Sequence, residues 1–155
     1  KLFNQSYRNG HPTFFRVSDH PNKNYDIDVQ FGKANVIKRG SRATVIAVSV
    51  MLDAVMKVCE KQDVTVLYYT TLEPFDYETL RDNCESEKIL VVEPEYEGSL
   101  YYDIHKALPG RALRIENIAF PREIFRNYGT YDEKMNYYGL NEKTIEKKLG
   151  DLLNH

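Results

Sequence analysis

Continuous apolar runs alternate along this chain with a segment whose apolar residues recur at helical spacing, and this order predicts the fold class. Continuous apolar runs occur at 43–49, 64–69 and 89–93, without the polar alternation of a half-exposed strand. Such runs are typical of strands covered on both faces, as in a parallel sheet between helices. Residues 51–61, between the first two runs, place their apolar side chains on one helical face. The pattern therefore predicts strands that alternate with crossover helices.

The segment 64–93 is the clearest of these units, because a chemically defined turn separates its first strand from its helix. Pro74 cannot continue a strand ladder, since it has no backbone N–H. Asp76 is a residue type that caps a helix by accepting from free backbone N–H groups. We therefore predict that a helix begins directly after Asp76.

Further elements on both sides of this unit complete the predicted domain. A short strand is expected within 34–40, a helix over 100–108 and a last strand over 112–119, followed by an irregular stretch up to a closing helix capped by Asn141. Strands that alternate with helices in this order predict an α/β fold, a three-layer α/β/α sandwich with a mostly parallel sheet.

The beginning of the chain differs from the rest. After the apolar end of a helix come a predicted short strand at 13–17 and a polar, proline-containing linker at 18–24. We predict that residues 1–24 are the tail of a preceding domain with its linker, and that residues 25–155 form the α/β domain. The first residue is Lys1 rather than Met, which suggests a fragment of a larger protein.

Composition excludes some classes of function. The formal net charge of −2 gives no global electrostatic reason to bind nucleic acid or an anionic membrane. No apolar run approaches the roughly 20 residues that a membrane-spanning helix needs. Cys59 and Cys84 have no CxxC neighbour, and we interpret them as small buried hydrophobic residues. These features predict a cytoplasmic protein that binds neither nucleic acid nor a membrane.

Candidate chemistry gathers where the predicted strands end, because ligands of open α/β sheets bind beyond the carboxyl ends of the strands. Glu93, Glu95 and Glu97 follow one strand; they could bind a cation or act as acid and base, or form a solvated acidic loop. Glu93 directly ends a buried run, so we expect it to be partly desolvated. The sequence contains no nucleophile elbow, phosphate-binding loop or dinucleotide fingerprint.

Five motifs, in the right order, resemble the C-terminal part of a transketolase-family enzyme that depends on thiamine diphosphate. This family includes transketolase, deoxyxylulose-phosphate synthase and the beta subunits of 2-oxo-acid dehydrogenases. The matching segments are TFFRVSDHP, FGKANVIKRGSRATVIAVS, TTLEPFD, ILVVEPEYEGSL and FPREIFRNYGTYDEKMNYYGLNEKTI.

The resemblance implies that different domains of the intact enzyme have different roles. In the family, the cofactor lies between a diphosphate-binding domain and a pyrimidine-binding domain, and residues 1–24 resemble only the end of the latter. We therefore expect no catalytic, cofactor-binding or metal-binding residue in this chain, with thiamine diphosphate and magnesium bound elsewhere in the intact enzyme. The implied partners are the upstream thiamine-binding domains or subunit and a second copy in a dimer.

The resemblance also marks two candidate substrate-binding residues, Arg16 and His20. Arg16 falls on the first arginine of the family's strand-end segment, and a guanidinium suits a phosphate; the alternative is an ion-paired strand arginine. The family's second arginine is replaced by Asp19. A carboxylate there would repel a phosphate unless His20 or an upstream group supplies positive charge.

Three functions follow as hypotheses. The leading one is the structural, dimer-forming and rim-forming domain of a transketolase-like ketol transferase, active when intact but inactive as this fragment. The second is the same domain of a deoxyxylulose-phosphate synthase or a 2-oxo-acid dehydrogenase beta subunit. The third is a stand-alone α/β binding or assembly module without chemistry, which the missing second arginine favours.

Overall fold

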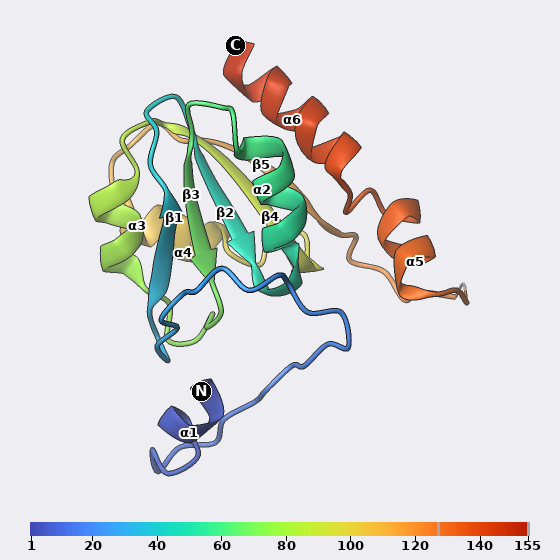
Figure 1. Cartoon of the computed structure of the whole chain (residues 1–155). Coiled ribbons are helices and arrows are strands. Elements are labelled where there is room, and N and C mark those ends of the chain that lie inside the picture. The colour runs from blue at the N-terminus through green and yellow to red at the C-terminus, as the bar shows by residue number, and fades with distance from the viewer. Residues whose placement is uncertain (127, 155) are drawn as a thin grey trace.

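A five-stranded sheet forms the centre of the computed structural model, which describes residues 1–126 and 128–154 (Figure 1). The strand order is β1-β3-β2-β4-β5; β1 pairs antiparallel with β3, and the remaining pairs are parallel. The predicted α/β class with a mostly parallel sheet is thus confirmed. The strands are β1 (Ala34–Lys38), β2 (Thr44–Val48), β3 (Thr65–Tyr69), β4 (Lys88–Tyr96) and β5 (Arg114–Phe120).

Helices cover both faces of the sheet. Helices α2 and α6 contact each other on one face, and α3 and α4 contact each other on the opposite face. Figure 1 shows these two layers with the sheet between them. The helical segments are α1 (Leu2–Ser6), the 3₁₀ turn η1 (Ser49–Met51), α2 (Leu52–Cys59), α3 (Tyr77–Asn83), α4 (Tyr101–Ala107), α5 (Tyr131–Tyr137) and α6 (Glu142–Asn154).

Successive residues of the central strands belong to two separate cores. Val45 and Ala47 of β2 pack in the layer of α2 and α6, whereas Ile46 and Val48 pack in the layer of α3 and α4. All five residues of β2 are buried. This double coverage is the physical reason why the strand reads as a continuous apolar run.

The helix starts also follow the sequence pattern. Asp76 Oδ1 accepts a hydrogen bond from the backbone N–H of Thr79 at 3.2 Å, and Asn141 Oδ1 accepts from the N–H of Thr144 at 3.0 Å. Both predicted caps are therefore confirmed. Cys59 and Cys84 are buried free thiols, as expected. In the described part of the chain, no helix has the length and apolar character needed to cross a membrane.

Two expectations about secondary structure were wrong. Residues 13–17 are not a strand, because they pair with no strand among residues 1–126 and 128–154, and Phe14 and Val17 are 90% and 87% exposed. The stretch before Asn141 is not wholly irregular, since it contains α5. Thr130 and Glu133 form a reciprocal capping box at the start of α5, and this pattern is visible in the sequence.

The order of the strands also creates the crevice in which the candidate site lies. β2 and β4 are neighbours, but the crossover that leaves β2 leads to β3 on one side, and the crossover that leaves β4 leads to β5 on the other. Chain segments therefore diverge from the carboxyl ends of β2 and β4. Ligands of open α/β sheets bind at such a switch point.

Candidate functional site

A cavity of about 660 Å³ opens at this switch point. Its walls come from residues Arg16–Asp19, where the linker begins, from the ends of β2, β4 and β5, from the segment around Phe125, and from α5. In Figure 1 the linker, in blue, passes the arrowhead end of β2 on its way from α1 to the sheet. Segments far apart in the sequence therefore enclose one space.

Arg16 closes one side of the cavity and is held at the end of β4. Its Nη1 donates to the carbonyl oxygen of Pro94 at 2.7 Å and to Glu95 Oε1 at 2.6 Å. The ion pair expected as an alternative is present, although the backbone here is no strand. The predicted role of Arg16 in substrate binding stays a prediction, and the guanidinium now has a carboxylate partner.

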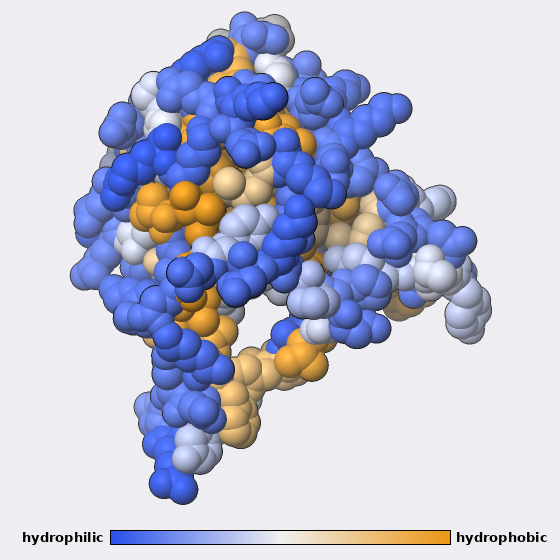
Figure 2. Space-filling model, in the orientation of Figure 1, coloured by the Kyte–Doolittle hydropathy of each residue, from blue (hydrophilic) through white to orange (hydrophobic). Residues whose placement is uncertain are grey.

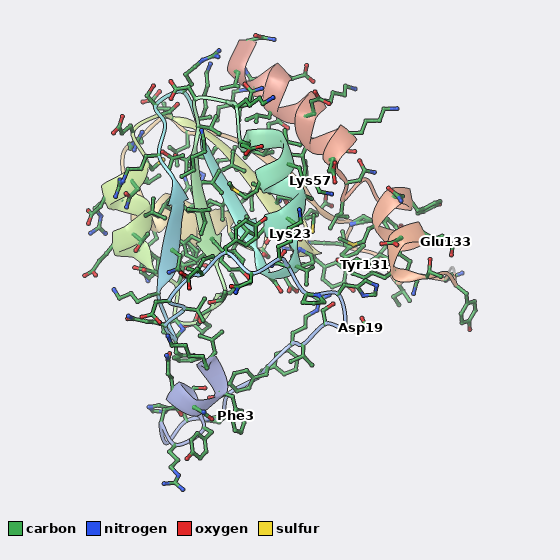
Figure 3. All side chains as sticks on the ribbon, in the orientation of Figure 1. Phe3, Asp19, Lys23, Lys57, Tyr131 and Glu133 are labelled. Atoms are coloured by element: carbon green, nitrogen blue, oxygen red, sulfur yellow. The ribbon has the colours of Figure 1, made fainter. Side chains whose placement is uncertain are left out.

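His20, the second predicted substrate-binding residue, contacts a different wall. Its ring stacks on Tyr131 of α5, with ring centroids 4.0 Å apart and planes 12° apart. His20 Nδ1 lies 2.7 Å from Asp19 Oδ1, and this hydrogen bond lowers the pKa of Asp19. Figure 3 shows Asp19 and Tyr131 on facing segments. The structure thus places Arg16 and His20 in one segment, residues 16–20, but gives each its own partner.

The linker is anchored by polar contacts that the sequence did not reveal. Asn22 Nδ2 donates to the carbonyl oxygen of Ser49 at 2.7 Å, and the backbone N–H of Lys23 donates to Asp53 at 3.1 Å. The hydroxyl of Tyr25 donates to the same carboxylate at 2.7 Å; burial and this bond raise the pKa of Tyr25. The start of α2 therefore holds the linker against the cavity.

Ser49, which the sequence places at the carboxyl end of the first apolar run, is a further residue of the cavity wall. It directly follows β2, and its φ of 52° lies in the left-handed region, which is uncommon for residues other than glycine. Such backbone conformations cluster at functional sites. The signal in the sequence was weak, because a serine after an apolar run does not by itself indicate positive φ.

The three glutamates after the predicted strand do not form a common site. Glu93 is fully buried and accepts hydrogen bonds from Ser99 and, at 3.0 Å, from Asn117; burial raises the pKa of Glu93. Glu95 pairs with Arg16, and Glu97 is exposed. The expected desolvation of Glu93 is confirmed. Within residues 1–126 and 128–154, no group of three acidic, histidine or cysteine residues could hold a metal ion.

Comparison with known proteins gives a consistent picture of the fold. A solved split-gene transketolase, described as an inactive beta4 tetramer, superposes with a TM-score of 0.71 at 18% identity, over 83% of this chain and 45% of that chain. The chain has a transketolase-type fold. The sequence resemblance to the transketolase family is thus confirmed at the level of the fold.

Two curated proteins match in sequence. A 33.6 kDa uncharacterized protein of the fasciation locus of Rhodococcoides fascians is 29% identical over 144 residues, which cover 90% of this chain and 46% of that protein. The 1-deoxy-D-xylulose-5-phosphate synthase of Francisella philomiragia is 23% identical over 136 residues, which cover 84% of this chain and 22% of the synthase. The chain spans less than half the length of these relatives. No protein-family profile matches it.

Proposed function

We propose that this chain is the C-terminal domain of a transketolase-like ketol transferase that depends on thiamine diphosphate. The transketolase-type fold and the synthase relative support this assignment. In this role the domain contributes to assembly and to the rim of the active site, while other parts of the protein hold the reaction centre.

The exposed apolar face of the N-terminal segment is the observation that carries the assembly role within this proposal. The rings of Phe3 and Tyr7 stack with centroids 5.3 Å apart, and Phe15 lies 5.7 Å from Phe3. Phe14 and Val17 beside them are almost fully exposed. Figure 2 shows this apolar surface extending below the more polar body, and Figure 3 labels Phe3 on α1. Large exposed apolar patches mark interaction sites.

A preceding domain or a partner subunit would cover this face. The solved neighbour is a split-gene transketolase that forms a tetramer, which supports assembly of this chain with a separate subunit or with a second copy. The linker that joins the exposed face to the sheet is held by Arg16 and Asp53. A partner that binds the exposed face would therefore also affect the position of the linker at the cavity.

Thiamine diphosphate and magnesium would be bound outside this chain. Magnesium needs several oxygen ligands that converge, whereas Glu93, Glu95 and Glu97 diverge to separate environments. These three carboxylates do not form a magnesium site, and no step of the reaction is assigned to them. In this proposal the chain contributes its linker and part of the rim of the active site.

Two measurements test the proposal. Calorimetric titration of residues 1–155 with thiamine diphosphate and magnesium should give no binding; micromolar affinity would place the cofactor in this chain after all. The complete protein, purified with any partner subunit, should transfer a ketol unit from a ketose to an aldehyde only when thiamine diphosphate is present.

The synthase relative favours a second candidate, in which the domain belongs to a deoxyxylulose-phosphate synthase. Formation of 1-deoxy-D-xylulose 5-phosphate by the complete protein would select this candidate over ketol transfer. An assembled protein that forms neither product with the cofactor present would instead indicate a binding or assembly module without chemistry.

A further inference from the structure

We propose that the cavity at the ends of β2 and β4 binds a small carboxylic acid with an aromatic or branched apolar body. Its volume of about 660 Å³ lies within the roughly 300–1,000 Å³ of small-molecule sites. Its place at the topological switch point is the place where open α/β sheets bind ligands. The inference does not rest on the proposed thiamine-dependent chemistry, because it is argued from the residues that line the cavity.

One wall of the cavity suits a flat apolar group. Phe120 at the end of β5 lies 5.2 Å from Phe125, and Tyr96 at the end of β4 lies 6.3 Å from Phe125, measured between ring centroids. Val50 and Met135 add aliphatic surface. Aromatic rings at these separations provide edges and faces against which a further ring can pack. The body of the ligand is therefore apolar and preferably planar.

The charges around the cavity determine the polar part of the ligand. Arg16 is paired with Glu95, and Asp19 is hydrogen-bonded to His20. The ammonium of Lys134, which also lines the cavity, has no hydrogen-bond or ion-pair partner in the part of the chain that the structure describes. One cation is thus available, which fits a ligand with a single negative charge.

This arrangement disfavours a phosphate ester. Asp19 and Glu95 both line the cavity, and two carboxylates repel a dianion more than a monoanion. The donors of Arg16 that point to Pro94 and Glu95 are already used. A carboxylate needs only the charge of Lys134 and one further donor.

Ser49 provides that donor at the cavity wall. Its hydroxyl has no hydrogen-bond partner among residues 1–126 and 128–154, and its left-handed backbone is held by Asn22, which donates to the Ser49 carbonyl oxygen. A hydroxyl that is free to rotate can donate to a carboxylate oxygen. The cavity therefore combines an apolar wall with a few polar groups, which is the composition of small-molecule sites.

Titration of residues 1–155 with phenylacetate tests the inference, with chemical-shift mapping as the readout. Binding of phenylacetate should be saturable and should shift the amide resonances of Ser49, Val50 and Lys134. 2-Phenylethanol and 2-phenylethylamine should bind at least tenfold more weakly. Lys134→Gln should weaken phenylacetate binding roughly tenfold or more, since a charge-assisted hydrogen bond is lost. Lys61→Gln is the matched control, because Lys61 is exposed in the turn before β3. This turn lies at the amino end of the strand, whereas the cavity lies at the carboxyl ends of β2 and β4.

Four results would overturn the inference. The first is the absence of saturable phenylacetate binding at millimolar concentration. The second is equal binding of the amine, which would show that Lys134 does not select the charge. The third is a set of perturbed amides remote from the cavity. The fourth is equal affinity of Lys134→Gln and wild type. None of these results bears on the transketolase-like role of the complete protein.

Discussion

Arg16 and Glu95 are 79 positions apart in the sequence, and their side chains form an ion pair of 2.6 Å. The pair joins the linker before the α/β domain to the end of β4, and the Pro94 carbonyl oxygen accepts a second bond from the same guanidinium nitrogen. The position of the linker, and with it one wall of the cavity, therefore depends on this contact.

Arg16→Ala should release the linker without unfolding the domain. The Arg16 side chain is 53% exposed, and pairs of this kind contribute at most about 1 kcal/mol to the free energy of unfolding. Denaturant unfolding should therefore change little, while hydrogen exchange of residues 13–20 becomes faster. Arg8→Ala is the control, since the Arg8 guanidinium lies over the Tyr7 ring, at 5.0 Å from its centroid, and not at the end of β4. Unchanged exchange in Arg16→Ala would show that other contacts hold the linker.

Asp76→Ala should destabilise the domain much more. Asp76 accepts from the N–H of Thr79 at 3.2 Å, from the Thr79 hydroxyl at 2.6 Å and from the N–H of Ala34 at 3.0 Å, thereby joining α3 to β1. Loss of the cap and of a partner for a part-buried N–H should cost about 2–4 kcal/mol. The exposed Glu78, in the same helical turn, provides the control Glu78→Ala, with an expected effect below about 0.5 kcal/mol. Equal effects of the two substitutions in urea unfolding would contradict this role.

The contribution of Asp76 should also depend on pH. Burial alone raises its pKa, but the hydrogen bonds from Thr79 and Ala34 outweigh burial and hold the pKa below its ordinary value of 3.8. A carboxyl whose pKa is lower in the folded state adds stability above the ordinary value, and this is lost as the pH falls through the folded pKa. The difference in stability between wild type and Asp76→Asn should therefore shrink below pH 3.8.

The sequence predicts those features that depend on local chemistry and on burial of whole segments. The apolar runs predict β2, β3 and β4 because both faces of these strands are covered. Asp76 predicts the start of α3 because a cap needs only neighbouring backbone groups. The capping box of Thr130 and Glu133 would likewise have revealed α5.

Features that depend on distant partners could not be derived in this way. The residue types at 13–17 predict a strand, but a strand needs a neighbour, and the described part of the chain provides none for this segment. The ion pair of Arg16 and Glu95 depends on the order of the strands. Equally, the cavity exists only because the connections from β2 and β4 diverge. The neighbouring residues in the sequence do not indicate which distant segments come together in the fold.

Glu93→Gln should change how the stability depends on pH. Burial raises the pKa of Glu93 above its ordinary value of 4.5, although hydrogen bonds from Ser99 and Asn117 oppose the shift. Because the folded state holds the proton more tightly, stability that is present below pH 4.5 is lost as the pH rises through the folded pKa. Glutamine carries no charge, so the stability of Glu93→Gln relative to wild type should increase from pH 4 to pH 7. Glu97→Gln, at an exposed position four residues further along the chain, is the comparison substitution, and parallel stability curves for Glu93→Gln and wild type would contradict the argument.

Gly40→Ala and Gly150→Ala should change stability in opposite directions. A Cβ at Gly40 would lie 2.4 Å from the backbone nitrogen of Val64 and 2.7 Å from the carbonyl carbon of Asp63. Backbone atoms cannot rotate away, so the turn before β2 must shift, at a cost of about 1–3 kcal/mol. Gly150 lies inside α6, where a Cβ meets nothing within 4 Å, and alanine there should stabilise by about 0.5–1 kcal/mol. Chemical denaturation of both variants measures the two signs side by side. A neutral Gly40→Ala would mean that the approach of residues 63–64 to Gly40 is looser than the structure shows, whereas a destabilised Gly150→Ala would mean that the outer face of α6 is covered by a partner.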